Sequence, residues 1–324
     1  MSKLLSKLFS ASVLAVACSF STSLLAAQPP LRIVIGFPPG GVLDTFARSL
    51  AEEISKRESR PVVVVNKPGA STLLAVNEVA RAKPDGSTIL LTHSMPFTIY
   101  PYTYDKLQHT QDDFAPIGYL ASIPIVMTSG KNQPFNTAQQ YIAWLRKNPD
   151  QGAVGVISLG GQPHFALLQM AKAMGVPVYP VPYPGTPQLL NDQIGGNIGV
   201  GLLAIGPQIE LYRAGKINLL GLAGQSTVKF MPEVKTLESQ GIQGFDKLSL
   251  WYGAYFPKDT PSELVNKYEK MLTEIVNQPV LQKKFEGQAL ILDGKSKEYA
   301  VDLLDQERKY WQPIIQKSGF KADK

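Results

Sequence analysis

Two glycine-containing segments have the residue types and spacing of an anion-binding site. The first, Phe37 to Asp44, reads Phe-Pro-Pro-Gly-Gly-Val-Leu-Asp and joins a predicted strand to a predicted helix. Gly40 and Gly41 have no Cβ to obstruct a ligand. The start of the following helix directs unpaired N–H groups and partial positive charge into the loop. We expect Phe37, Gly40 and Gly41 to contact an anion; an ordinary turn capped by Asp44 is the alternative.

The second segment, Ser158 to His164, reads Ser-Leu-Gly-Gly-Gln-Pro-His and precedes another predicted helix. Its side chains supply hydrogen-bond donors at Ser158, Gln162 and His164, and its backbone is bare at Gly160 and Gly161. Two such loops from different parts of the molecule can clamp one carboxylate from opposite sides. A purely structural role for His164 at the start of the helix is the alternative.

The same segments argue against an enzyme. A nucleophile elbow around Ser158 needs glycine two residues before it, but Val156 stands there. The spacing around Gly40 is not Gly-x-Gly-x-x-Gly, so the dinucleotide fingerprint is missing. The chain has only three histidines, and we expect neither a catalytic triad nor a metal site among them. We expect no cofactor.

A third candidate segment, Thr92-His93-Ser94-Met95, ends a predicted strand. Open α/β sheets bind their ligands outside the carboxyl ends of the strands. We therefore expect His93 and Ser94 to be pocket donors; a solvated loop histidine is the alternative. Trp251-Tyr252-Gly253 is a candidate for a crossing strand with an aromatic side chain facing a cleft, or for ordinary core packing.

These segments are embedded in a regular alternation of strand-like and helix-like stretches. Leu31 to Ile35 predicts a buried strand, and the next helix, from Asp44 to Arg57, has apolar residues at intervals of three and four. Similar pairs continue to about Leu222, which indicates an α/β fold with parallel sheets covered by helices on both faces. The alternation stops near residue 249, and two helical stretches follow, Pro261 to Asn277 and Lys297 to Lys317.

Length and connectivity predict two lobes. A mature chain of roughly 300 residues exceeds the usual size of a single core, and no flexible linker divides it. The late helices need an earlier part of the chain to pack on. We therefore expect residues 28–124 and 250–324 to form one lobe, residues 125–249 to form the other, and crossing strands to join them.

Residues 1–27 have the features of a signal peptide. Lys3 and Lys7 precede a run without charge from Leu8 to Ala27, which ends in small residues. A retained anchor and a lipoprotein at Cys18 are the alternatives, although Ala15 stands where a lipoprotein usually has leucine. Cys18 is the only cysteine, so the mature chain can form no internal disulfide. The net charge of +6 is spread among acids and does not indicate nucleic-acid binding.

Together these segments resemble the tripartite tricarboxylate transporter receptors, also called Bug proteins, over nearly all of the mature chain. The order and spacing of the segments carry the resemblance: Ile33 to Asp44, Val62 to Ala70, Pro84 to Thr88, Asp113 to Ile117, Gly160 to His164, Val181 to Gly185, Asp192 to Gly196, Trp251 to Gly253, and Thr260-Pro261.

The resemblance implies a type II periplasmic-binding-protein fold, with mostly parallel central sheets in two lobes that close around a carboxylate. It implies a ligand held largely by backbone N–H groups and bound waters of the two glycine loops. By position, the site would be lined by Phe37, Gly40, Gly41, Ser94, Gly160, Gly161, His164 and the stretch around Leu203. Asp44 matches an acid that fixes the first loop.

The chain departs from the family pattern in ways that bear on the ligand. Gly199 and Leu203 stand where many members have acidic residues, which would suit the ammonium group of an amino acid. We therefore expect a small organic acid without an amine. Gly69 to Thr72 is less glycine-rich than usual, and His93 is atypical. We expect a monomer that serves membrane transporter subunits in the periplasm; a sensor for a membrane signalling system is the alternative.

The signal peptide gives a direct prediction about the native product. Because the charged start, apolar run and small residues end at Ala27, the exported protein should begin near Gln28. N-terminal sequencing of the purified native protein checks this. Recovery of intact Met1, or of a lipid-modified Cys18, would contradict it.

Overall fold

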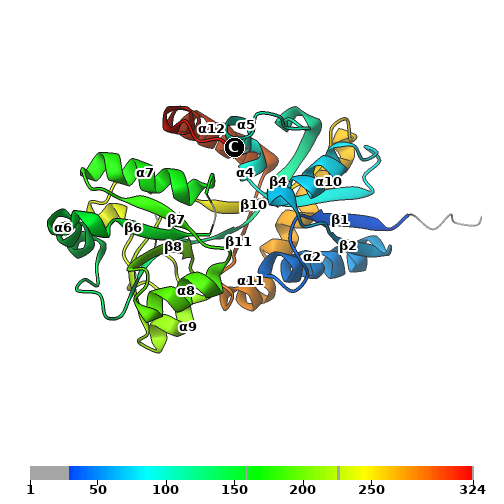
Figure 1. The fold of residues 1–324 in the computed structure, drawn as a ribbon. Helices are drawn as coiled ribbons and strands as arrows, with labels where there is room; N and C mark the ends of the chain where they lie inside the picture. The colour runs from blue at the N-terminus through cyan, green and yellow to red at the C-terminus, as the bar shows by residue number, and fades with distance from the viewer. Residues whose placement is uncertain (1–28, 158, 225–226, 323–324) are drawn as a thin grey trace, which may run out of the picture.

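The computed structural model describes residues 29–157, 159–224 and 227–322 and shows two mixed sheets covered by helices (Figure 1). The predicted signal peptide and Ser158 lie outside these residues. The six-stranded sheet has the order β11 (Ile291–Lys295), β4 (Phe114–Ile123), β10 (Leu250–Pro257), β3 (Thr88–His93), β1 (Leu31–Ile35), β2 (Val62–Asn66). The five-stranded sheet has the order β7 (Tyr179–Pro182), β6 (Ala153–Val156), β8 (Val200–Ala204), β5 (Ile125–Gly130), β9 (Ile217–Leu222).

We call the part built on the six-stranded sheet the first lobe, and the part built on the five-stranded sheet the second lobe. The first lobe carries α2 (Val42–Glu58), α3 (Leu73–Ala80), α4 (Met95–Thr98), α5 (Tyr100–Thr103), α10 (Ser262–Val276), α11 (Pro279–Glu286) and α12 (Lys297–Ser318). The second carries α6 (Ala138–Lys147), α7 (Gln162–Met174), α8 (Thr186–Gly195) and α9 (Gln208–Arg213). Short 3-10 turns occur at 70–72, 111–113, 149–151 and 238–240.

The predicted α/β fold is confirmed, and the strand directions refine it. In the first lobe β1 pairs in parallel with β2 and β3, whereas β10 pairs antiparallel with β3 and β4. In the second lobe β6 pairs in parallel with β7 and β8, whereas β5 pairs antiparallel with β8 and β9. Most described strands in each sheet therefore point the same way. The reversed strands are β10 and the edge strand β11 in the first lobe, and β5 in the second.

Side-chain alternation explains why both faces of each sheet are covered. In β1, Ile33 packs in a core with α2, α10 and α11, whereas Val34 packs in a core with α3 and α12 on the other face. In β8, Leu202 faces the core under α6 and α7, and Leu203 faces α8. These central strands are thus buried on both sides, which explains their nearly continuous apolar runs, whereas the edge strands β2 and β7 are partly exposed.

The chain passes between the two sheets without a flexible linker. A single residue, Pro124, separates β4 in one sheet from β5 in the other. The return passage leads from the turn at 238–240 into β10. Ala289, between α11 and β11, packs against Ile205 and Ile209 of the second lobe. The lobe boundaries predicted at 124/125 and 249/250 fall at these passages and stay a prediction.

Helix α12 contacts both lobes, which the sequence pattern did not show. Ala300 and Leu304 pack in a core of the first lobe, whereas Trp311 and Ile315 pack in the large core that joins most of the second lobe to Leu73, Ile99 and Tyr100 of the first. Figure 1 shows this helix beside α4 and α5 and reaching towards α7. The terminal helix therefore docks on two lobes and not on one. Between its two apolar ends it buries Glu307.

This bridging packing predicts a large effect of truncating Trp311. The side chain is fully buried, and Trp311→Ala should lower the free energy of unfolding by about 3–5 kcal/mol through lost burial and the cavity left behind. Tyr299→Ala on the same helix is the control, because Tyr299 is 46% exposed and its loss should cost less than about 1 kcal/mol. Urea unfolding measures both. Equal losses in the two variants would contradict the bridging role.

Candidate functional site

The first glycine loop is held open by a side chain of the helix that follows it. Gly40 has a φ of 88°, and Gly41 is the extended residue that precedes α2. The N–H of Gly40 donates to Asp44 Oδ2 at 3.0 Å. A Cβ on Gly40 would have no atom within 4 Å, so open space lies beside the loop. The loop needs glycine at residue 40 for its left-handed backbone.

Asp44 is committed to this loop by further hydrogen bonds. Arg48 Nε donates to Oδ2 at 2.9 Å, and Asn66 Nδ2 donates to Oδ1 at 2.8 Å. Asn66 also donates to the carbonyl oxygen of Phe37 at 3.1 Å. The hydrogen bond from Arg48 lowers the pKa of Asp44 to about 2, and those from Gly40 and Asn66 act in the same direction against the effect of burial. Asp44 is therefore an ionised residue that organises the loop.

The second glycine loop has the same construction with a different side chain. Gly160 has a φ of 78°, Gly161 is extended, and α7 follows. The N–H of Gly160 donates to His164 Nδ1 at 3.0 Å. His164 thus occupies the place in its loop that Asp44 occupies in the first. Burial lowers its pKa, so the ring is neutral and carries its proton on Nε2.

This geometry gives His164 the structural role that the sequence left as the alternative. Its Nδ1 is used by Gly160, and its ring stacks on Phe165 at 4.8 Å between centroids. A ligand would therefore contact the loop that His164 fixes. Of the His164 ring itself, only the Nε2–H group remains to donate to a ligand. Ser158, the other predicted donor of this loop, lies outside the described residues.

Both loops lead into helices whose first N–H groups have no side-chain cap. Neither Gly41 before α2 nor Gly161 before α7 supplies a capping side chain. The first-turn N–H groups of a helix need a partner from outside it, and together with the helix dipole they favour an anion. Uncapped helix starts, one in each lobe, are the main electrostatic feature of the site.

The third predicted segment lies beside the first loop in the fold. His93 is buried at the end of β3, where its ring meets Phe37 at 5.7 Å and Tyr100 at 6.2 Å. Its Nδ1 accepts from the N–H of Met95 at 3.2 Å, and burial lowers its pKa to about 4. His93 is therefore a neutral ring in an aromatic cluster, and not a solvated loop residue. Ser94 next to it is fully buried.

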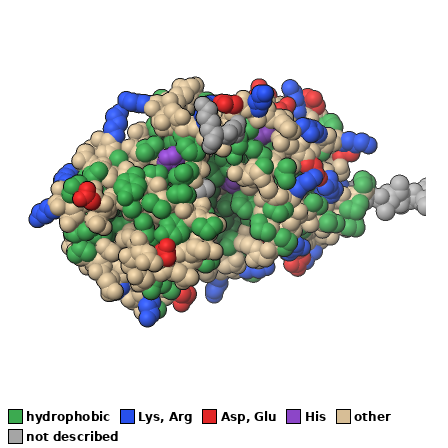
Figure 2. Space-filling model, in the orientation of Figure 1, with side chains coloured by type: hydrophobic (Ala, Val, Ile, Leu, Met, Phe, Trp, Pro, Cys, Tyr) green, Lys and Arg blue, Asp and Glu red, His purple; other side chains and the backbone are tan. Residues whose placement is uncertain are grey.

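Contacts connect the segments from the two lobes. Ser94 lies near the buried carboxyl group of Glu307 on α12 and lowers its pKa, although the Ser94 hydroxyl group has no hydrogen-bond partner among the described residues. Gln162, the first residue of α7, donates from Nε2 to Glu307 Oε2 at 3.2 Å. The predicted residues Phe37, His93, Ser94 and Gln162 thus form one connected series. Figure 2 shows that the surface is hollowed between the two lobes, with hydrophobic side chains on its walls.

Leu203 lies elsewhere. It is 2% exposed and packs with Leu189 and Leu190 of α8 in the core of the second lobe. Leu202 is buried in the opposite core. Both side chains are thus used in core packing, and the contribution of the chain around Leu203 to the ligand site stays a prediction.

Thr72 is a residue that the sequence analysis did not single out. A Cβ on Gly36, just before the first loop, would lie 2.4 Å from Thr72 Cβ, so the two segments touch. Thr72 Oγ1 is buried and has no hydrogen-bond partner among the described residues. Ala70, Ser71 and Thr72 all have positive φ. Such strain in residues other than glycine is concentrated at functional sites. The sequence had pointed to this segment only through its low glycine content.

The C-terminal segment also reaches the second loop. A Cβ on Gly160 would lie 2.6 Å from the ring of Phe320, which also meets the His164 ring edge-on at 5.0 Å. The N–H of Ala322 donates to the carbonyl oxygen of Thr103 in the first lobe at 2.8 Å. The tail after α12 therefore spans from one lobe to the glycine loop of the other.

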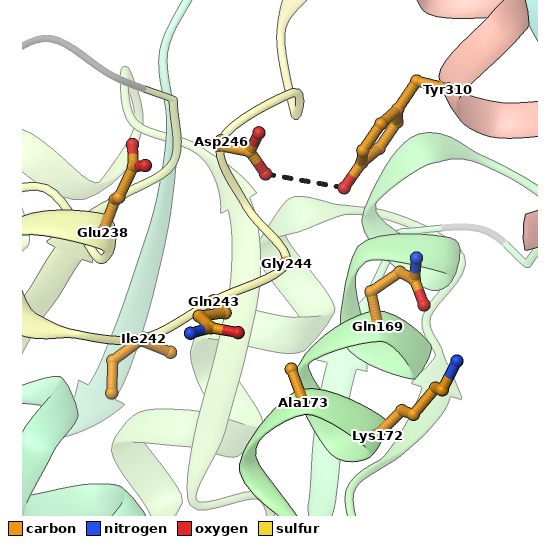
Figure 3. A pocket seen from close by; sticks show the side chains of 9 residues that line it. All are labelled: Gln169, Lys172, Ala173, Glu238, Ile242, Gln243, Gly244, Asp246 and Tyr310. Carbon is orange, nitrogen blue, oxygen red and sulfur yellow. Dashed lines mark hydrogen bonds between the residues drawn. The ribbon is translucent and has the colours of Figure 1, made fainter.

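A well-formed groove lies apart from these loops. It has a volume of about 520 Å³ and lies between α7, residues 238–246 and Tyr310 (Figure 3). In this groove the hydroxyl group of Tyr310 donates to Asp246 Oδ1 at 3.5 Å. None of the predicted ligand-binding residues lines this groove, so we do not assign the site to it.

Two further properties concern metals and membranes. Within residues 29–157, 159–224 and 227–322, no three His, Cys, Asp or Glu side chains are grouped as metal ligands. Among the helices that the structure describes, none combines the length and the apolar character that a bilayer crossing needs.

Comparison with known proteins assigns the chain to a family. The model of the tripartite tricarboxylate transporter family receptor matches residues 46–320. A UPF0065 protein from the tcbD-tcbE intergenic region of Pseudomonas sp. strain P51 is 27% identical over 288 residues, covering 88% of this chain and 85% of the relative. The solved structure of the periplasmic binding protein BugD has 27% identity and a TM-score of 0.73, covering 90% and 98% of the two chains.

Another solved structure, R. palustris Rpa4515 with adipate, has a TM-score of 0.78 at 22% identity, covering 90% of this chain and 98% of that one. With the two mixed sheets, these likenesses define a two-lobed receptor of the type II periplasmic-binding-protein fold. The chain belongs to the tripartite tricarboxylate transporter receptor family, which consists of solute-binding receptors and not of enzymes. The resemblance seen in the sequence is confirmed.

The charge network of the first loop predicts a pH-dependent loss of stability. Because the pKa of Asp44 is below its usual value, the stability it contributes is complete above about pH 4 and disappears as the pH falls towards 2. Asp44→Asn should lower the free energy of unfolding by about 1–2 kcal/mol at pH 7. The difference in free energy of unfolding between Asp44→Asn and the unaltered protein should become smaller as the pH falls from about 4 to about 2.

Urea unfolding at several pH values measures this difference. Asp302→Asn, an exposed position on α12, is the control and should leave stability nearly unchanged. A constant difference between Asp44→Asn and the unaltered protein from pH 7 to pH 2 would show that the carboxylate charge does not hold the loop.

Proposed function

We propose that this protein is a periplasmic receptor that binds a small organic carboxylate without an amine and delivers it to a membrane transporter. The observation that carries the proposal is the matched construction of the two glycine loops. Each has a left-handed glycine held by a side chain four residues on, followed by an uncapped helix start. One loop belongs to each lobe, so a carboxylate between them would bind both.

Backbone groups provide most of the binding in this proposal. The polar side chains of the two loops already have hydrogen-bond partners in the protein. Asp44 accepts from Arg48 and Gly40, and His164 Nδ1 accepts from Gly160. Donors from the first turns of α2 and α7 are fixed in direction by their helices, so they lose little freedom when a ligand binds. Bound waters can complete the contacts.

The charges near the loops favour an acid that lacks an ammonium group. Asp44 is paired with Arg48, and Glu307 is buried among hydrogen-bond donors. Hydrophobic side chains surround the hollow in Figure 2, which suits an apolar body on the ligand. The adipate in the R. palustris structure is a ligand of this chemistry.

The predicted lobe boundaries support a closing motion. We propose that residues 28–124 and 250–324 form one lobe and residues 125–249 the other, and that they move about the passages at Pro124 and near residue 249. The same proposal includes export guided by residues 1–27, action as a monomer, and membrane transporter subunits as the partner. The periplasmic relatives and the family itself support it.

A thermal-shift screen of organic acids tests the ligand class. Adipate, malate and benzoate represent aliphatic, hydroxylated and aromatic acids. At 100 times its dissociation constant, a ligand should stabilise the protein by about 2.7 kcal/mol and raise the melting temperature by a few degrees. Aspartate and glutamate should give smaller shifts than the acids without an amine. If only amino acids, sugars or cations stabilise the protein, the proposal fails.

A matched pair of valine variants tests the place of binding. Gly41 has a backbone that any residue adopts, and a Cβ there would have only Pro38 O near it, at 3.9 Å. Gly41→Val should therefore fold normally and lose at least tenfold in affinity, because valine fills the space of the ligand. Gly287→Val is the control, at an exposed residue with no atom within 4 Å of the added Cβ. Equal affinities of the two variants would contradict a ligand at the first loop.

A further inference from the structure

Glu307 is a buried acid in the middle of the helix that joins the two lobes. It is 4% exposed and lies on the same face of α12 as Ala300, Leu304 and Trp311. Among the described ion pairs none includes Glu307, so no cation neutralises it in this structure. Burying a carboxyl group without a cation is costly, and a hydrophobic residue would fit the pattern of this face.

The partners of Glu307 come from both lobes. Trp251 Nε1 of β10 donates to Oε1 at 2.8 Å, and Gln162 Nε2 of α7 donates to Oε2 at 3.2 Å. Ser94 and Thr98, at the end of β3 and in α4, lie near the carboxyl group and lower its pKa. The hydroxyl group of Ser94 is buried without a hydrogen-bond partner among the described residues, and that of Thr98 donates to the carbonyl oxygen of Ser94. The hydrogen-bond partner Gln162 and the nearby Ser94 are both residues that the sequence predicts at the ligand site.

The surroundings of Glu307 favour its neutral form. Burial raises the pKa of Glu307 to about 7, although the hydrogen bonds from Trp251 and Gln162 and the nearby Ser94 and Thr98 act in the opposite direction. The titratable groups that face it are the phenols of Tyr119 on β4 and Tyr255 on β10, and no charged side chain is among its partners. The carboxyl group can therefore gain or lose its proton near neutral pH.

The side-chain carbonyl oxygen of Gln162 is not used in a hydrogen bond among the described residues. Gln162 Nε2 is used by Glu307, whereas Gln162 Oε1 is buried without a partner among the described residues. A buried polar group without a partner is costly. If Glu307 accepts a proton, its O–H can donate to Oε1 of a rotated amide, and Nε2 becomes free to donate to another acceptor.

We propose that Glu307 is a positioning residue of the ligand site, and that its charge sets the affinity for an anionic ligand through Gln162 and the start of α7. The inference rests on the proposed function, since it needs an organic acid between the glycine loops. When Glu307 is ionised, its negative charge repels the anionic ligand, and its carboxylate accepts the hydrogen bond from the Gln162 amide N–H. When the acid binds, Glu307 takes up a proton from solvent, and the Gln162 amide turns its N–H towards the ligand.

The test is isothermal titration of adipate and malate at pH 6 and pH 8 into unaltered protein and Glu307→Gln. In the unaltered protein the affinity should be about five- to tenfold weaker at pH 8, as uptake of one proton requires. Glu307→Gln should bind at pH 8 about as tightly as the unaltered protein binds at pH 6. Using the same acid for every variant removes the effect of the ligand's own titration.

Two further variants separate positioning from a merely structural role. Glu58→Gln is the matched control, because Glu58 is a buried acid of the first lobe that pairs with Arg60 and Lys267; it should keep the pH dependence of the unaltered protein. Trp251→Phe removes a hydrogen bond that favours the ionised form of Glu307. Trp251→Phe should move the midpoint of the pH dependence to higher pH. This variant still tests the inference if Glu307→Gln does not fold.

The outcomes distinguish the inference from the proposed function. If adipate or malate binds and Glu307→Gln shows the pH dependence of the unaltered protein, the inference is wrong and the proposed function stands. The same conclusion follows if Trp251→Phe leaves the midpoint unchanged. If the unaltered protein binds none of the organic acids at either pH, the proposed function fails and the inference falls with it.

Discussion

The site depends on keeping the first N–H groups of two helices unpaired. Each helix would normally satisfy these groups with a side chain just before it, but here that residue is glycine. The loops keep their shape because a side chain inside each helix accepts the N–H of a glycine four residues earlier. An ionised aspartate does this in one lobe and a neutral histidine in the other, so the same geometry is reached with different charge.

The second constraint is that the lobes share a helix. The N-terminal half of α12 packs in the first lobe and its C-terminal half in the second, and the following tail places Phe320 on the second loop. Any opening of the hollow must therefore act on contacts made by α12 as well as on the strand passage at Pro124. Glu307 lies at the centre of these contacts, with partners in both lobes. This places a group with a pKa near 7 where the lobes meet.

The sequence predicted the elements of the fold better than the partners of individual side chains. Strand β1 was expected at Leu31 to Ile35 and lies there, and α2 begins two residues before its predicted start at Asp44. Leu203 was expected at the ligand site and lies in a core, because a strand covered on both faces gives no local sign of which side chain faces a cleft. Glu307 was missed, although an acid that interrupts the apolar face of 300–315 was a visible signal.

The sequence by itself determined the α/β fold, the family, and the positions of the two glycine loops. These follow from local properties: apolar periodicity, the freedom of glycine, and the unpaired N–H groups at a helix start. Only the tertiary structure decided that His164 fixes its loop, that His93 is buried against Phe37, and that Glu307 joins Trp251 to Gln162. Such roles depend on which distant side chains meet at hydrogen-bonding distance, and spacing along one chain does not contain that information.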